Sequence, residues 1–127
     1  MIRHVVALSF LASLFLALPV IAADEVSEID ICRDFSLVAK DVMTARQKKR
    51  PMSATLPIAR DRIKAWADKY GRPMEMEEAE EWAAEIVMHA YRRSASDIVE
   101  LQRNTISDFE NFYFQDCYTG MTSDSEE

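Results

Sequence analysis

The chain has 127 residues, of which 22 are acidic and 15 are basic, so its formal net charge is −7. This length allows one domain at most, and the excess of acids argues against nucleic acid as a partner. Because only 2 glycines and 4 prolines are present, and β-branched runs are absent beyond the N-terminal apolar segment, the composition favours helices over strands.

The first 23 residues have the three parts of a secretory signal peptide. A short basic start containing Arg3 precedes an apolar run over residues 5–18, and the small residues Ala22 and Ala23 follow, either of which suits signal peptidase. We expect residues 1–23 to be removed on export, which places the mature protein in the periplasm or outside the cell without a membrane span. The alternative is an uncleaved membrane anchor formed by the same apolar run.

The two cysteines, Cys32 and Cys117, are expected to form a disulfide, because an even pair is normally oxidised in an exported protein. The bond would close a loop of about 85 residues, for which chain entropy predicts a stabilisation of about 4–5 kcal/mol. That value is comparable to the net stability of a small domain. A free thiol is the alternative, although no histidine or CxxC partner lies nearby to lower the pKa of either thiol.

The first predicted helix begins after Ser27, a helix-capping residue with Asp30 three positions later, and ends near Gln47. Pro51 prevents its continuation. Apolar residues recur at every third or fourth position and predict one buried face. This face consists of Ile31, Phe35, Val38, Val42 and Ala45.

The second predicted helix starts near Ser53 or Thr55, tolerates a proline in its first turn, and ends before Gly71, a typical residue after a helix C-terminus. Its inner face comprises Ala59, Ile63, Trp66 and Tyr70. The third predicted helix starts after Pro73, near Glu75. Its inner face comprises Met76, Ala79, Trp82, Ala83, Ile86, Val87, Ala90 and Tyr91.

The fourth predicted helix runs from about Asp97 to Tyr118, and Gly120 is expected to end it. The aromatic side chains expected to face the core are Phe109, Phe112 and Tyr113. Phe114 is expected to point away from the core, toward solvent or a partner. The polar, acidic residues 121–127 predict a disordered tail.

These elements predict an all-α domain over residues 24–120, formed by a small bundle of about four helices, closed by one disulfide and preceded by the signal-peptide helix. Short connections are compatible with an up-and-down bundle or an irregular orthogonal one. Cys32 lies early in the first helix and Cys117 late in the fourth. If these helices are antiparallel, both cysteines lie at one end of the bundle.

Charge is segregated along the chain. Residues 46–72 hold nine basic and two acidic groups, whereas residues 73–127 hold three basic and fourteen acidic groups. One interpretation is that the second and third helices lie side by side and neutralise each other. The other is a basic surface that binds an anionic partner of the cell envelope, such as a lipid headgroup, an anionic polymer or an acidic protein. The candidate residues are Arg46, Gln47, Lys48, Lys49 and Arg50.

Metal binding is the alternative function. Met74 and Met76 form a thioether pair of a kind that binds Cu(I), and His89 is the only histidine after the signal peptide. Glu81 and Glu85 share its helix face, but no second histidine and no HExxH pattern accompany them. Copper or zinc bound through Met74, Met76 and His89 is therefore a secondary hypothesis.

We expect no enzymatic activity, no catalytic residues and no cofactor. No serine stands in a nucleophile motif, and two glycines cannot form a phosphate-binding loop. A hydrolase using two carboxylates stays open in principle, but no pair among the 22 acids stands out. The leading hypothesis is a periplasmic interaction protein that binds an envelope protein or an anionic polymer.

Several short motifs occur in a recognisable order along the mature chain. They are Cys32, Arg46-Gln47, Pro51-Met52-Ser53, Ala90-Tyr91, Phe109 and Cys117. This order resembles a group of uncharacterised small exported two-cysteine helical proteins of Gram-negative bacteria and their phages. Those proteins often have a glycine soon after Arg-Gln, where this chain has Lys48-Lys49-Arg50. The resemblance implies no activity and no site residues.

Overall fold

The computed structural model describes residues 25–124, which contain four α-helices and no strand. The helices are α1 (Glu28–Gln47), α2 (Met52–Lys69), α3 (Met76–Tyr91) and α4 (Val99–Ser123). The predicted all-α class is confirmed for this part of the chain. The predicted signal peptide over residues 1–23 lies outside the described residues, as do residues 125–127 of the predicted tail.

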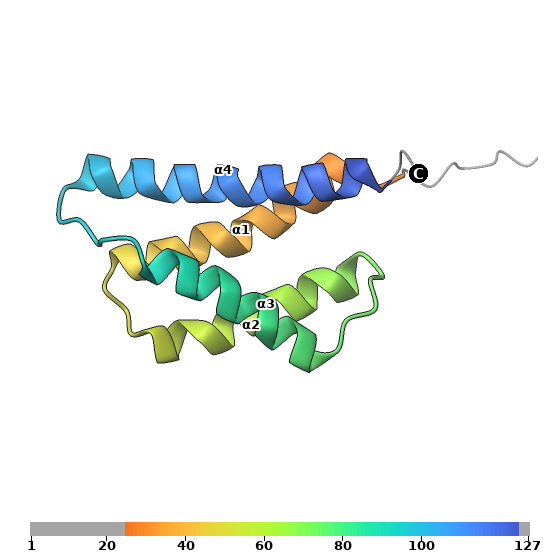
Figure 1. Ribbon diagram of the computed structural model, residues 1–127, viewed down its shortest axis with the longest axis horizontal. Coiled ribbons are helices and arrows are strands. Elements are labelled where there is room, and N and C mark those ends of the chain that lie inside the picture. The colour runs from red at the N-terminus through yellow and green to blue at the C-terminus, as the bar shows by residue number, and fades with distance from the viewer. Residues whose placement is uncertain (1–24, 125–127) are drawn as a thin grey trace, which may run out of the picture.

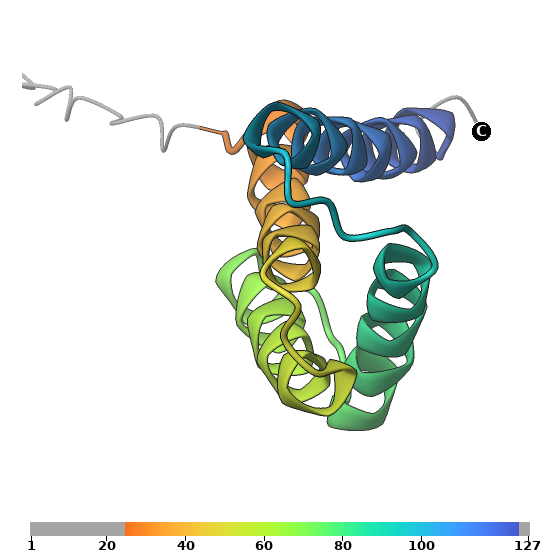
Figure 2. The ribbon, with the colours of Figure 1, turned by 90° about the vertical axis from the view of Figure 1, so that its left-hand side faces the viewer.

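The helices form two pairs, α1 with α4 and α2 with α3, and α1 also packs against both members of the second pair. Figure 2 shows α4 on one side of the molecule and the α2–α3 pair on the other, with α1 between them. In Figure 1, α4 extends along the length of α1. Lys40 and Glu110 form an ion pair at 3.5 Å between these two helices, which are antiparallel. Between Glu25 and Asp124, no helix is both long and apolar enough to cross a membrane.

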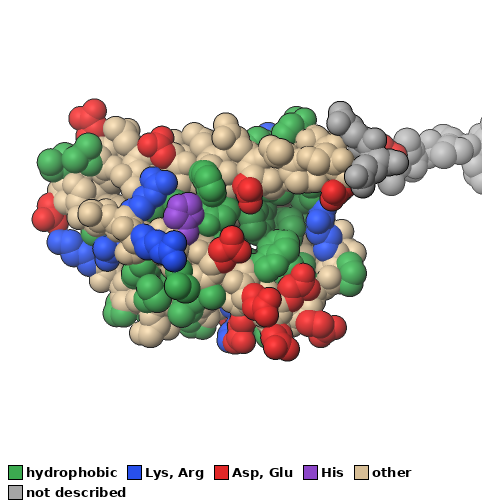
Figure 3. Space-filling model, in the orientation of Figure 1, with side chains coloured by type: hydrophobic (Ala, Val, Ile, Leu, Met, Phe, Trp, Pro, Cys, Tyr) green, Lys and Arg blue, Asp and Glu red, His purple; other side chains and the backbone are tan. Residues whose placement is uncertain are grey.

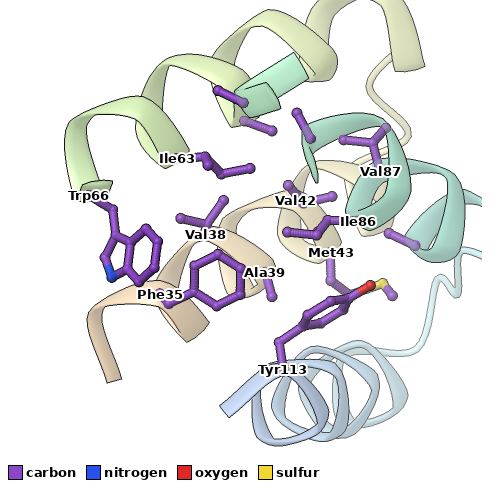
Figure 4. Close-up of a cluster of buried hydrophobic side chains, with 14 of the residues drawn as sticks. Phe35, Val38, Ala39, Val42, Met43, Ile63, Trp66, Ile86, Val87 and Tyr113 are labelled. Atoms are coloured by element: carbon purple, nitrogen blue, oxygen red, sulfur yellow. The ribbon is translucent and has the colours of Figure 1, made fainter. Parts of the chain in front are cut away.

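One hydrophobic core is shared by all four helices. Met43 of α1, Ile63 of α2, Val87 of α3 and Phe109 of α4 are fully buried, each with no measurable exposure. Figure 4 shows the first three of these converging with Phe35 of α1. Burying a side chain of this size contributes about 1.5–3 kcal/mol, so the core rather than helix propensity holds the helices together.

The predicted cysteine pair is confirmed in the structure. The sulfur atoms of Cys32 and Cys117 lie 2.12 Å apart, and their Cα atoms are separated by 5.5 Å. Because Cys32 is in the first turns of α1 and Cys117 is in the last turns of α4, the bridge joins the two helices at one end of the molecule. α1 and α4 are antiparallel, as this placement of the two cysteines requires.

The N-terminus of α1 is capped as predicted, because the Ser27 hydroxyl accepts a hydrogen bond from the Asp30 amide at 3.2 Å. α2 begins at Met52, one residue earlier than the earliest predicted start, because Pro51 occupies the position before it. Pro57 therefore lies in the helix interior rather than in the first turn. There it removes one backbone hydrogen bond from α2.

The predicted end of the fourth helix is wrong. α4 continues through Gly120 to Ser123, so the domain does not stop at residue 120 and residues 121–123 are not a disordered tail. Glycine in a helix costs about 1 kcal/mol relative to alanine. Met121, the residue after Gly120, packs against α1, where its sulfur lies 3.5 Å from the Cys32 sulfur. This contact compensates for the cost of the glycine.

Two residues predicted to face the core are exposed instead. Met76 is 46% exposed at the start of α3, while Met74, two residues earlier, is buried in its place. Phe112 is 48% exposed on α4. α4 buries Phe109 and Tyr113 against the rest of the molecule, and Phe112 lies about 100° around the helix from Tyr113, outside this contact.

α1 and α2 end in the same backbone motif. The Arg50 amide donates to the Ala45 carbonyl at 3.0 Å, and the Arg72 amide donates to the Ala67 carbonyl at 2.9 Å. This six-residue closure is a Schellman motif, which requires a left-handed residue. At the end of α2 this left-handed residue is Gly71, with φ +63°, at the position after the helix C-terminus that the sequence predicts. At the end of α1 it is Lys49, with φ +58°.

Replacing Lys49 by glycine should therefore stabilise the protein by about 1 kcal/mol, because glycine adopts the left-handed conformation without strain. Gly71→Ala is the matched opposite change and should destabilise the protein by a similar amount. Urea unfolding followed by circular dichroism measures both free energies. A Lys49→Gly variant that is less stable than the parent would contradict this account of the turn.

Candidate functional site

Gln47 does not belong to the predicted basic surface, because its side chain is only 4% exposed. Its Nε2 donates to the Ser94 carbonyl at 3.2 Å, and its Oε1 accepts from the Ser96 amide at 2.9 Å. Arg46 donates from Nε to the Arg93 carbonyl at 2.9 Å. These two side chains fasten the α3–α4 connection to the end of α1, so they have an internal role.

The other three residues of the predicted surface are exposed. Lys49 forms an ion pair with Asp97 at 2.8 Å, which lowers the pKa of that carboxyl. Lys48 and Arg50 form no ion pair with any residue between 25 and 124. With Arg62 of α2 they line a small cleft of about 230 Å³. We call Lys48, Arg50 and Arg62 the basic corner.

The positive charge of α2 is neutralised from two sides. The pairs that α2 forms with its neighbours are Arg60 with Glu80 of α3 at 3.3 Å, Lys69 with Asp34 of α1 at 2.6 Å, and Arg62 with Asp41 of α1. Of these three ion pairs, one joins α2 to α3, as the predicted neutralisation of the second helix by the third requires, and two join α2 to α1. Such exposed pairs contribute little to stability, about 0–1 kcal/mol each, but they leave α2 few free cations.

The three ligands of the metal hypothesis do not converge. Met74 is buried in the core, and Met76 is exposed at the beginning of α3. His89 follows Met76 by thirteen positions on the same helix, which separates them by about 20 Å. One ion cannot contact both residues. Within the described residues, no group of three histidine, cysteine or acidic side chains is arranged to hold a metal.

A groove runs between α3 and α4, with α1 as its floor. Its main recess has a volume of about 690 Å³. The apolar side chains that line it are Ile31 and Phe35 of α1, Trp66 of α2, Trp82 and Ile86 of α3, and Tyr113, Cys117 and Met121 of α4. A second hollow of about 390 Å³ shares Glu85, Tyr113 and Asp116 with the first. We call the two hollows together the α3–α4 groove.

The rim of the groove is mainly acidic. Figure 3 shows apolar side chains at the bottom of the hollow and acidic side chains around it. The acids that line the main recess are Glu28, Glu85, Asp116 and Asp124. None of them forms an ion pair within residues 25–124. One cation, Arg72, also lines this recess, and its guanidinium lies 5.5 Å from the centre of the Trp66 ring.

His89 lies in the wall of the second hollow and is partly buried. Its Nδ1 is 3.0 Å from the Tyr113 hydroxyl, and its ring is 5.0 Å from the Phe109 ring. Burial lowers the pKa of His89, and the positive charge of Arg93 lowers it further. Burial raises the pKa of Tyr113 to about 12. At neutral pH this pair is therefore uncharged.

The sequence does not predict the groove, because the spacing of apolar residues in α4 assigns Phe112 to the core. One signal was available, since Asp116 continues the apolar line that contains Phe109 and Phe112. An acid in such a line suggests a face that is only partly covered.

Comparison with family models, with curated proteins and with solved structures finds no match to this chain. The resemblance to small exported two-cysteine proteins stays a prediction. The structure offers two candidate sites, an apolar groove with an acidic rim and a smaller basic corner.

The internal role of Gln47 can be tested against its neighbour. Gln47→Ala should lower the free energy of unfolding by about 1–3 kcal/mol, because the Ser96 amide loses its partner. Lys48→Ala is the control, and its effect should stay within about 0.5 kcal/mol because that side chain is exposed. Chemical denaturation measures both, and equal effects would contradict the assignment.

His89 should make stability depend on pH. The folded state binds the proton of His89 less tightly than the unfolded state, in which the pKa of the imidazole is about 6.5. Stability should therefore fall as the pH decreases from about 7 toward the lowered pKa of the folded state. In urea titrations between about pH 7 and 5.5, His89→Gln should show a flatter profile than the parent. Parallel profiles would refute this source of pH dependence.

Proposed function

We propose that the protein is an exported, non-enzymatic interaction protein that binds an apolar segment of an envelope protein in the α3–α4 groove. The observation that carries this proposal is the groove itself, a recess with aromatic lining whose rim acids form no ion pair within residues 25–124. Concave, mainly apolar sites with a few polar groups are where proteins commonly bind ligands and partner segments.

Two features support the proposed export. The sequence of residues 1–23 has the form of a signal peptide. The Cys32–Cys117 pair at disulfide-bonding distance suits an oxidising compartment such as the periplasm.

The polar groups of the groove lie where they can contact a bound partner. His89 lines the second hollow, and its Nδ1 lies 3.0 Å from the Tyr113 hydroxyl. Glu85 and Asp116 line the same hollow. These groups are suited to orienting a partner at the groove wall.

The proposal predicts where a partner can be crosslinked. A photoreactive amino acid at Phe112, which is 48% exposed in the groove, should give a discrete crosslinked species in the native periplasm. The control is Leu37, which is 42% exposed on α1 and does not line the groove. The same species at both positions, or none at Phe112, would contradict binding in the groove.

The basic corner is the second candidate surface, because Lys48 and Arg50 are exposed beside a cleft and form no ion pair with any described residue. It would bind an anionic polymer or an acidic protein of the envelope through charge. The two surfaces can be separated in the crosslinking experiment. If the groove binds the partner, reversing both charges with Lys48→Glu and Arg50→Glu leaves the Phe112 crosslink intact. Loss of that crosslink would assign binding to the basic corner instead.

A further inference from the structure

We infer that the occupant of the α3–α4 groove is a basic amphipathic helix of about three turns, supplied by the partner protein. This inference rests on the proposed function and specifies its ligand. It is carried by three properties of the groove, namely its charge, its apolar lining and its length.

The charge of the groove selects a cationic ligand. The acids Glu28, Glu85, Asp116 and Asp124 line the groove together with two cations, Arg72 in the main recess and Arg92 in the second hollow, so the acids outnumber the cations. These acids form no ion pair with any described residue, in contrast to the acids around α2, which pair with its cations. Lysine or arginine side chains at the flanks of a bound segment would meet this unpaired negative charge. An anionic lipid surface would be repelled by it.

The lining of the groove selects a helix over an extended segment. The recess is lined by side chains of all four helices, whose backbone groups are already bonded within each helix. An extended peptide would lose backbone hydrogen bonds to water and find no strand edge here to replace them. A helix keeps its own backbone hydrogen bonds and can present one apolar face to Trp82, Ile86 and Tyr113.

The length of the groove sets the size of the ligand. Along α4 it extends from Phe112 in the second hollow to Asp124 at the far end of the main recess. Twelve helical positions correspond to about 18 Å. A partner helix of about 12 residues would span this distance, with apolar side chains at positions i, i+3, i+4 and i+7 facing the floor.

The protein contains its own reporter of groove occupancy. The chain has 2 tryptophans, Trp66 and Trp82, and both line the main recess. Trp66 is 6% exposed, whereas Trp82 is only partly buried. A ligand that covers Trp82 should shift its fluorescence emission to shorter wavelength, provided that the ligand contains no tryptophan.

The test titrates the full mature chain with two synthetic helices of about 14 residues that share one leucine face and differ only in their flanks. One helix carries lysines and the other carries glutamates at the same positions. The lysine helix should bind about tenfold more tightly at low salt, which is the effect of a few exposed charge contacts. Raising the salt concentration should reduce the difference, because the contacts are screened.

Matched variants assign this preference to the rim. The combined changes Glu85→Gln, Asp116→Asn and Asp124→Asn should remove most of the preference for the lysine helix. The control removes the same number of charges outside the groove, with Glu75→Gln, Glu77→Gln and Glu78→Gln at the start of α3. This control should keep the preference.

Any of three results would overturn the inference: equal binding of the two helices, tighter binding of the glutamate helix, or an equal loss of the preference in the two triple variants. If the Phe112 crosslink persists while the lysine helix shows no preference, the groove function stands and the basic helix is the wrong occupant. Vesicles containing anionic lipid provide a last comparison, and a Trp82 shift with vesicles alone would also overturn the inference.

Discussion

The contact between α4 and α1 is the constraint on which the rest of the structure depends. Phe109 is fully buried and Tyr113 is 6% exposed in this contact, and the Cys32–Cys117 bridge closes it at one end. For a loop of this length chain entropy predicts about 4–5 kcal/mol from the bridge, comparable to the net stability of a small domain. α4 has no such packing against α3, which it meets mainly through Tyr113 and His89. The groove exists because α4 is held beside α3 without closing onto it.

The sequence predicts the helices well because their signals are local. Ser27 caps α1 and Gly71 closes α2 in the manner that their residue types predict. The buried faces of α1, α2 and most of α3 follow the spacing of apolar residues. The cysteine pair follows from residue count and helix phase. These predictions require only neighbours along the chain.

The errors arise where the outcome depends on which elements meet in space. Phe112 follows the apolar spacing of α4 but is exposed, because α4 packs mainly against one helix rather than two. Gln47 is polar and stands in a basic segment, yet it is buried because the α3–α4 connection supplies partners for its amide. Gly120 does not end α4, because Met121 beyond it packs against Cys32. Spacing alone contains none of this information.

Charges that are segregated along the sequence partly neutralise one another in the folded protein. The excess of basic residues in α2 is offset by acids of both α1 and α3, so the basic corner is small. The excess of acids leaves carboxylates along the groove, including Glu85 and Asp116, that form no ion pair within the part of the chain that the structure describes. The surface best suited to a partner is therefore acidic at its rim and apolar at its floor, rather than basic as the segment Arg46 to Arg50 predicts.

Hydrogen exchange on the oxidised and reduced protein tests the central claim most directly, because it measures how firmly each helix is held. With the bridge intact, the amides of α4 should be protected as far as Tyr118. After reduction, protection should fall first in the part of α4 that contains Cys117, while α2 and α3 stay protected by their own packing. Equal loss of protection in all four helices, or no change in α4, would contradict the account that the bridge to α1 holds this wall of the groove in place.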